Sequence, residues 1–142
     1  MANVNATNYA KFISPTPGNQ MGAEWDGRMI VETESVNANN RAQNDTVNIG
    51  VLRAGEVFVT GWIKGANLGA STTVAVGDAG DAARYLAATN SNAAFSAQMI
   101  EIGANKGVGY KNTGTADVPI FVTIGGGAAN NAFQAVIVKA RN

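Results

Sequence analysis

The stretch from Val47 to Leu86 constrains the fold of this chain more than any other. Side chains in residues 57–63 alternate between two faces, and both faces carry apolar groups. A period of two residues is typical of a β-strand, and apolar groups on both faces indicate a strand in the middle of a sheet system. Because glycine-containing turns separate this strand from its neighbours, the stretch predicts a run of short strands.

The same alternation continues along most of the chain. We predict strands at residues 28–34, 45–52, 57–63, 72–76, 98–102, 108–111, 118–124 and 133–139. About eight short strands at this spacing predict an all-β domain, either a β-sandwich or a jelly-roll-like barrel. Residues 81–95 are rich in alanine, which favours a short helix by propensity, although a strand or an irregular segment also fits. The glycine cluster at residues 125–131 predicts a long hairpin between the last two strands.

Residues 1–27 show neither helical nor strand periodicity. Two of the three prolines lie here, at positions 15 and 17, and proline favours an extended backbone. We therefore predict an extended N-terminal arm at residues 1–27 and a β-sandwich body at residues 28–142. The arm either contacts a partner protein or folds back onto its own body. The residues expected to make the partner contact are its apolar anchors, Tyr9, Phe12, Ile13, Met21 and Trp25.

Composition narrows the classes of function. The 142 residues contain no cysteine and no histidine, which excludes thiol nucleophiles, disulfide staples and the commonest metal ligand and general base. Ten basic and ten acidic residues balance, so we expect neither nucleic acid nor a membrane as partner. Charged residues make up 14% of the chain, against about 25% in an ordinary soluble domain, which suits a protein that normally exists in an assembly. We expect no enzyme activity, no cofactor and no metal.

The most specific cluster of polar residues lies in V-G-D-A-G-D-A-A-R-Y-L, residues 76–86. An aspartate at a Gly-Asp turn can accept backbone N–H bonds, and Arg84 is close enough in sequence to pair with either carboxylate. We predict that Asp78, Asp81, Arg84 and Tyr85 form a structural turn. The alternative is a cation site built on the two aspartates, but calcium takes about six to eight oxygen ligands and only two carboxylates are at hand.

Two further patterns have a functional and a structural interpretation. Glu32 and Glu34 share one face of a predicted strand, where they could serve as acid and base or bind calcium. We expect instead that they lie on the solvated face of an edge strand. The glycine clusters at residues 103–109 and 125–127 lack the spacing of a phosphate-binding loop, so they predict turns.

Several segments follow one another in an order that resembles the pattern of small structural proteins of tailed bacteriophages. Together they cover residues 45–140, and they are L-R-A-G-E-V-F-V-T-G-W-I-K, T-T-V-A-V-G-D-A-G-D-A-A-R-Y-L, G-V-G-Y, P-I-F-V-T-I-G-G-G and A-V-I-V-K. The shared pattern is an L-x-x-G turn, a valine-rich strand, a V-G-D-x-x-D element followed by R-Y, and a closing pair of strands with glycines. Residues 1–44 lie outside the resemblance.

This resemblance implies a β-sandwich protein of the virion and, in size and build, a capsid decoration or cement protein. Such proteins commonly sit as trimers at junctions between major capsid protein subunits and clamp the expanded shell. The implied partners are the major capsid protein and further copies of the chain in a homotrimer, on the capsid surface after synthesis in the host cytoplasm. Two alternatives stay open: a tail- or fibre-associated adhesion module that binds a host surface glycan through Trp62 or Tyr110, and a small enzyme with a carboxylate site.

Overall fold

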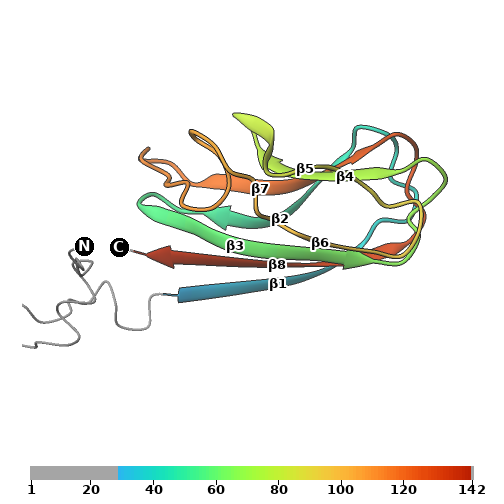
Figure 1. Ribbon diagram of the computed structural model, residues 1–142, viewed down its shortest axis with the longest axis horizontal. Helices are drawn as coiled ribbons and strands as arrows, with labels where there is room; N and C mark the ends of the chain where they lie inside the picture. Colours follow the sequence, from blue (N-terminus) through green and yellow to red (C-terminus); the bar gives the residue numbers. More distant parts are fainter. Residues whose placement is uncertain (1–28, 142) are drawn as a thin grey trace, which may run out of the picture.

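The computed structural model describes residues 29–141, and the regular secondary structure within them is β-strand. The eight strands are β1 (Met29–Asn37), β2 (Thr46–Leu52), β3 (Glu56–Gly65), β4 (Thr73–Asp78), β5 (Asp81–Asn90), β6 (Phe95–Gln98), β7 (Val118–Gly125) and β8 (Ala132–Arg141). Figure 1 shows them in two stacked layers. The predicted all-β class with about eight short strands is therefore confirmed.

The layers are two four-stranded antiparallel sheets, with strand orders β1-β8-β3-β6 and β2-β7-β4-β5. The pairing is nested along the chain, because β1 pairs with β8, β2 with β7, β3 with β6 and β4 with β5. Four nested antiparallel pairs divided between two sheets make a jelly roll, the eight-stranded architecture of two Greek keys. Of the two architectures that the sequence allows, the molecule adopts a sandwich with jelly-roll strand order.

The hydrophobic core fills the space between the two sheets. Buried and less buried residues alternate along β7 and β8, as expected for strands that turn one face to a core. The rings of Phe58 and Tyr85 meet in this core with centroids 4.4 Å apart. Each fully buried large apolar side chain contributes about 1.5–3 kcal/mol, so the sandwich is held mainly by this layer. Its largest apolar members are Tyr85, Phe58, Phe133, Ile49, Leu52, Ile63, Leu68, Met99, Ile120, Ile124 and Ile137.

Residues 81–90 form strand β5, so the helical propensity of their alanines does not determine the structure. The strand pairs with β4, and Leu86 lies opposite Val76 in the ladder. Tyr85 and Leu86 are both buried in the core. Propensity differences of a few tenths of a kcal/mol per residue are small beside the burial of two large side chains, which is why the strand forms.

The strands predicted at residues 98–102 and 108–111 are wrong. The sixth strand lies earlier, at Phe95–Gln98, where it pairs with the end of β3. The second segment bonds to the start of β3 without forming a regular strand: Phe58 N–H donates to the Tyr110 carbonyl and Gly109 N–H donates to the Phe58 carbonyl, each at 2.8 Å. Positive φ angles at Gly107 and Gly109 bend the backbone there, which prevents an extended strand.

The predicted hairpin between the last two strands is also wrong. Strands β7 and β8 belong to different sheets, so residues 126–131 cross from one layer to the other. Gly126 has φ +72°, and a Cβ atom there would collide with the Ser71 carbonyl oxygen. The glycine cluster therefore allows a close backbone approach at a crossover rather than a tight turn.

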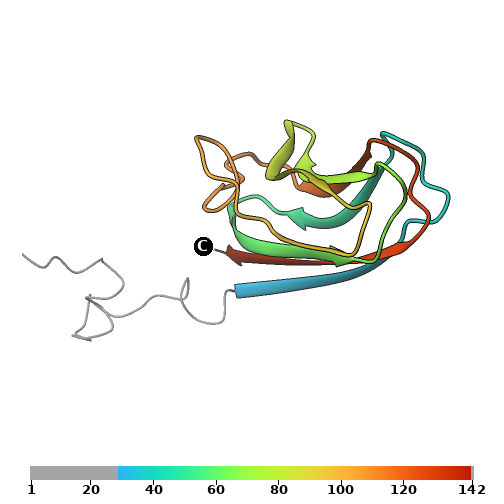
Figure 2. The same ribbon diagram turned by 45° about the vertical axis from the view of Figure 1, so that its right-hand side comes forward.

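The sandwich has two distinct ends, visible in Figures 1 and 2. One end carries the start of β1, the end of β8, the β4–β5 turn and the loop of residues 99–117; we call it the Met29 end. The opposite end carries the end of β1, the start of β8 and the loops of residues 66–72 and 91–94; we call it the Ala132 end.

Candidate functional site

The predicted turn residues come together where β4 passes into β5. Arg84 Nε lies 2.6 Å from Asp78 Oδ2, and Arg84 Nη2 donates to Asp78 Oδ1 at 3.1 Å. The Tyr85 hydroxyl donates to Asp78 Oδ2 at 3.1 Å, and the N–H groups of Gly80 and Asp81 donate to Asp78 Oδ1. Five donor groups thus converge on one carboxylate, which is buried together with Arg84. We call Asp78, Asp81, Arg84 and Tyr85 the turn cluster.

The turn cluster also holds the loop of residues 99–117. Arg84 Nη1 donates to the Asn105 carbonyl, and its guanidinium lies 4.1 Å from the centroid of the Tyr110 ring. Asp81 pairs with Lys106 Nζ at 3.4 Å and accepts the Ala83 N–H at 2.9 Å. These contacts join the β4–β5 turn to the loop through charge-assisted bonds and a cation–π contact.

The electrostatics of the turn cluster favour its charged, paired form. Burial alone would lower the pKa of Arg84, but the bonded Asp78 carboxylate outweighs it and raises that pKa above its ordinary value. Burial and the neighbouring Asp78 carboxylate raise the pKa of Tyr85, so the hydroxyl stays protonated and donates. The hydrogen bond from Ala83 N–H, together with Lys106, lowers the pKa of Asp81.

A second charged cluster, which the sequence analysis missed, lies inside the sandwich at the same end. Lys139 Nζ is 2.8 Å from Glu32 Oε1 and 2.9 Å from Glu56 Oε2. Arg141 Nη2 lies 3.1 Å from Glu56 Oε1. The ammonium also donates to the Val51 carbonyl on β2, so it links the two sheets. We call Glu32, Glu56, Lys139 and Arg141 the inner ion cluster.

Glu56 is the centre of the inner ion cluster and is fully buried. Burial would raise its pKa, but hydrogen bonds from Arg53 N–H, Lys139 and Arg141 together hold the pKa below its ordinary value of 4.5. A signal for the cluster was present in the sequence: Lys139 follows Phe133, Ala135 and Ile137 at a spacing of two, on the inward face of β8. A cation at an inward position requires a buried partner.

The prediction that Glu32 and Glu34 occupy a solvated face is correct only in part. Strand β1 is an edge strand, and Glu34 is exposed. Glu32 instead points inward and pairs with Lys139, and its Oε2 lies 3.4 Å from Val51 N–H. The prediction was wrong for Glu32 because the twofold alternation says which face two residues share but not which face is covered.

Two further kinds of feature concern residues 29–141, a cluster of metal ligands and a membrane-spanning helix. No three acidic side chains within that range gather closely enough to hold a metal ion. The same range contains no helix of a length and hydropathy that could span a bilayer. The carboxylates of Asp78 and Glu56 are instead bonded to arginine, lysine, tyrosine and backbone donors.

The outward face of the β1-β8-β3-β6 sheet is largely apolar near the Met29 end. The strand register places side chains in rows across the sheet. The first two rows are Met29, Ala140 and Val57, then Val31, Val138 and Thr60. The side chains of Met29 and Val31 are 57% and 61% exposed. Three more exposed apolar residues, Ile100, Ile102 and Val108, lie in the loop of residues 99–117 at this end.

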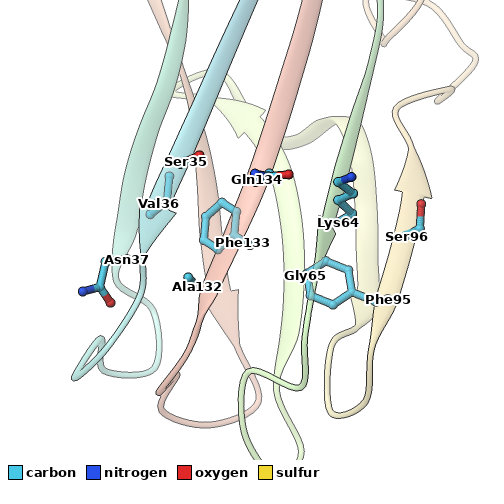
Figure 3. A pocket seen from close by; sticks show the side chains of 10 residues that line it. All are labelled: Ser35, Val36, Asn37, Lys64, Gly65, Phe95, Ser96, Ala132, Phe133 and Gln134. Carbon is cyan, nitrogen blue, oxygen red and sulfur yellow. The ribbon is translucent and has the colours of Figure 1, made fainter.

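Toward the Ala132 end the same face becomes polar and is hollowed. A pocket of about 620 Å³ draws its lining from all four strands of the sheet, as Figure 3 shows. A smaller hollow of about 300 Å³ lies beside Trp62 and shares Lys64, Ser96 and Gln134 with that pocket. We call the two together the sheet groove. Its lining residues are Thr33, Ser35, Val36, Asn37, Trp62, Lys64, Gly65, Phe95, Ser96, Ala132, Phe133, Gln134 and Val136.

The two aromatic residues considered as stacking platforms differ in environment. Trp62 is 42% exposed and borders the sheet groove. Tyr110 lies under the Arg84 guanidinium and meets Tyr85 edge-on, with centroids 6.3 Å apart. One face of Tyr110 is therefore already covered. The predicted contact residues of the arm, Tyr9, Phe12, Ile13, Met21 and Trp25, lie outside the described residues.

Comparison with known proteins finds the fold in phage capsids. No protein-family model and no curated protein matches the chain. Among solved structures, a chain of the cyanophage Pam1 capsid asymmetric unit is 17% identical with a TM-score of 0.60, over 80% of this chain and 85% of the other. A chain of the capsid of Ralstonia phage GP4 is 15% identical with a TM-score of 0.61, over 82% and 86%.

A third structural neighbour also comes from a phage capsid and is also similar at low sequence identity. A chain of the acidic stable capsid of Helicobacter pylori bacteriophage KHP30 is 13% identical with a TM-score of 0.54, over 80% of this chain and 86% of the other. Similarity at these identities concerns the fold. The body of this chain therefore shares its sandwich with nearly whole chains from the capsids of three phages.

Proposed function

We propose that this chain is a virion structural protein that binds the outside of a phage head and stabilises contacts between major capsid protein subunits. The observation that carries the proposal is the fold, which three phage capsids share over at least 80% of this chain. The balanced charge, the low charged fraction and the lack of histidine and cysteine support a structural rather than a catalytic role.

Attachment through the Met29 end follows from where the chain enters the body. The arm of residues 1–27 precedes β1 and therefore joins the sandwich at this end. The exposed apolar side chains of Ile100, Ile102 and Val108 lie at the same end and supply a second contact surface. A specific interface buries about 800 Å² on each partner, which an arm and a loop can supply together. Capsid symmetry repeats each contact, so avidity adds to a modest single-site affinity.

The two charged clusters support this mechanism because they stiffen the attachment end. The turn cluster fixes the loop of residues 99–117 to the β4–β5 turn. The inner ion cluster joins β1, β3 and β8 to the backbone of β2. A surface that is already rigid loses less conformational entropy on binding, so more of the contact energy remains as affinity.

Self-association as a homotrimer is the second part of the proposal. The exposed apolar rows around Met29 and Val31 are the surface that supports it, because exposed apolar patches of this kind are typical of interfaces. Light scattering should give the mass of three chains, and Val31→Asp should reduce it to one. A monomer at all concentrations tested would contradict this part and leave capsid binding open.

The direct test of attachment is cosedimentation of the purified chain with expanded phage heads that lack it. We expect saturable binding, with a number of bound copies fixed by the symmetry of the shell. Heads that have not expanded serve as the matched control. Failure to bind expanded heads would refute the proposed function, and binding to host cells or their glycans in its place would favour an adhesion module.

A further inference from the structure

We propose that the sheet groove is a saccharide-binding site in which the indole of Trp62 stacks against a sugar ring. This site goes beyond attachment to a shell, and the proposal does not depend on that attachment. It rests on the shape of the groove, the chemistry of its lining and its place on the molecule.

The groove is large enough for a short oligosaccharide and is already formed. Its two parts, of about 620 Å³ and 300 Å³, meet at Lys64, Ser96 and Gln134. Four strands at a spacing of about 4.8 Å make a lining about 14 Å across. Ligand sites are typically concave and preformed, with a mainly apolar lining and a few placed polar groups.

The lining matches the two surfaces of a sugar ring, an apolar C–H face and a rim of hydroxyl groups. The exposed indole of Trp62 offers a flat apolar surface with one N–H donor. Hydroxyl and amide side chains surround it, and these groups can both donate and accept hydrogen bonds. They are Thr33, Ser35, Asn37, Ser96 and Gln134.

Most of this hydrogen-bonding capacity is not used within residues 29–141. The side-chain bonds near the groove there are Gln98 to Thr60 at 3.4 Å, the Asn39 N–H to Asn37 Oδ1 at 3.0 Å and the Ala132 N–H to Asn131 Oδ1 at 2.9 Å. The hydroxyl groups of Thr33, Ser35 and Ser96 and the amide of Gln134 therefore face solvent ready for a ligand. These exposed side chains differ from Asp78 and Glu56, whose carboxylates accept hydrogen bonds from several donors of the protein itself.

Charge narrows the class of saccharide. The groove lining holds one cation, Lys64, and no carboxylate. A polycationic ligand would find no partner there, and a polyphosphate would meet a single positive charge. A neutral sugar or one with an isolated carboxylate fits this balance, and Lys64 would distinguish between the two.

The groove lies toward the Ala132 end, away from the start of β1. Strand β1 runs from the Met29 end to the groove, since Met29 pairs with Ala140 whereas Ser35 pairs with Gln134. A body held by its Met29 end leaves this part of the sheet accessible. The same molecule can therefore be attached at one end and bind a sugar at the other.

The test is calorimetric titration of the full chain with cellohexaose, chitohexaose and 6′-sialyllactose, the last of which carries one carboxylate. We expect saturable binding of at least one of them at millimolar concentration or below, with Trp62→Ala weakening it about tenfold or more. Gln134→Ala should weaken binding of the same sugar. Lys64→Met should weaken only the acidic one. The matched control, Glu34→Gln, changes an exposed residue of β1 that does not line the groove, and this variant should bind like the parent.

Tryptophan fluorescence and circular dichroism distinguish a loss of sugar binding from a loss of folding. With Trp25→Phe, Trp62 is the remaining one of the two tryptophans, so its emission reports on the groove. The emission should shift with sugar and stay constant on dilution without sugar, and Trp62→Phe should keep the circular dichroism of the parent. Absence of binding by all three sugars, or equal binding by a folded Trp62→Ala chain, would overturn the proposal. A shift on dilution alone would overturn it too, because it would show that a second copy fills the groove.

Discussion

At the Met29 end, charged side chains are buried and bonded to one another, whereas at the Ala132 end the polar side chains of the same sheet face solvent. Glu56 and Lys139 are 0% and 2% exposed, and Lys139 alone has partners on β1, β2 and β3. Ser96 and Gln134 line an open groove on the outer face. One sheet thus uses polar side chains for rigidity at one end and leaves them available for recognition at the other.

Removal of the arm, residues 1–27, should have the largest effect, and we expect it on binding to expanded heads. A chain without residues 1–27 should keep the circular dichroism of the body, because residues 29–141 contain a buried core between their two sheets. It should nevertheless lose cosedimentation with expanded heads, since the loop of residues 99–117 alone provides too small a contact. Full binding by the truncated chain would refute the role of the arm and move attachment to the body.

Substitution of the buried cation should have the next largest effect, this time on stability. Lys139→Met removes the ammonium that faces Glu32 and Glu56 and leaves carboxylates without their partner. Breaking a buried pair in this way costs about 3–5 kcal/mol of the free energy of unfolding. Urea denaturation measures it, and Lys64→Met at the groove is the matched control, with a change within about 0.5 kcal/mol. An equal loss of unfolding free energy in both variants would show that the buried lysine stabilises the fold no more than the exposed one.

The pH dependence of stability should also originate at the Met29 end. The pKa of Glu56 lies below its ordinary value of 4.5, so its ionised form stabilises the folded state above that pH. This contribution is lost as the pH falls from 4.5 through the folded-state pKa. Glu56→Gln should therefore flatten the fall in the free energy of unfolding on acidification, measured by urea denaturation at a series of pH values. If the free energy of unfolding of Glu56→Gln falls with pH as steeply as that of the parent, other carboxylates cause the acid dependence.

The smallest effect is expected at the groove. Gln134→Ala removes an exposed amide whose side chain makes no hydrogen bond within residues 29–141, so stability should change by less than about 0.5 kcal/mol. Cosedimentation with expanded heads should remain as in the parent, because the groove lies away from the attachment end. If Gln134→Ala lowers binding to expanded heads, the Ala132 end also contacts the shell. Attachment would then not be confined to the Met29 end.

The sequence predicted the fold class well because the alternation of β7 and β8 is regular and their inward faces are strongly apolar. It failed at residues 98–111, where positive φ angles at Gly107 and Gly109 replace a strand with a loop. The turn cluster could be anticipated because its residues lie within eight positions of one another, from Asp78 to Tyr85.

The inner ion cluster and the groove could not be anticipated in the same way. Glu32 and Lys139 are far apart in the chain and meet only because β1 pairs with β8. The groove likewise combines residues from four strands whose neighbours depend on the nested pairing. Local periodicity identifies strands and faces, but it does not determine which strands lie side by side.

If the chain stabilises a phage head from outside, it should change the temperature at which expanded heads release their DNA. Heads that lack the chain are heated with and without a saturating amount of it, and dye binding to released DNA gives the transition. The proposed function predicts release at a higher temperature when the full chain is present and no change with the chain that lacks residues 1–27. An unchanged release temperature at saturating binding of the full chain would contradict it.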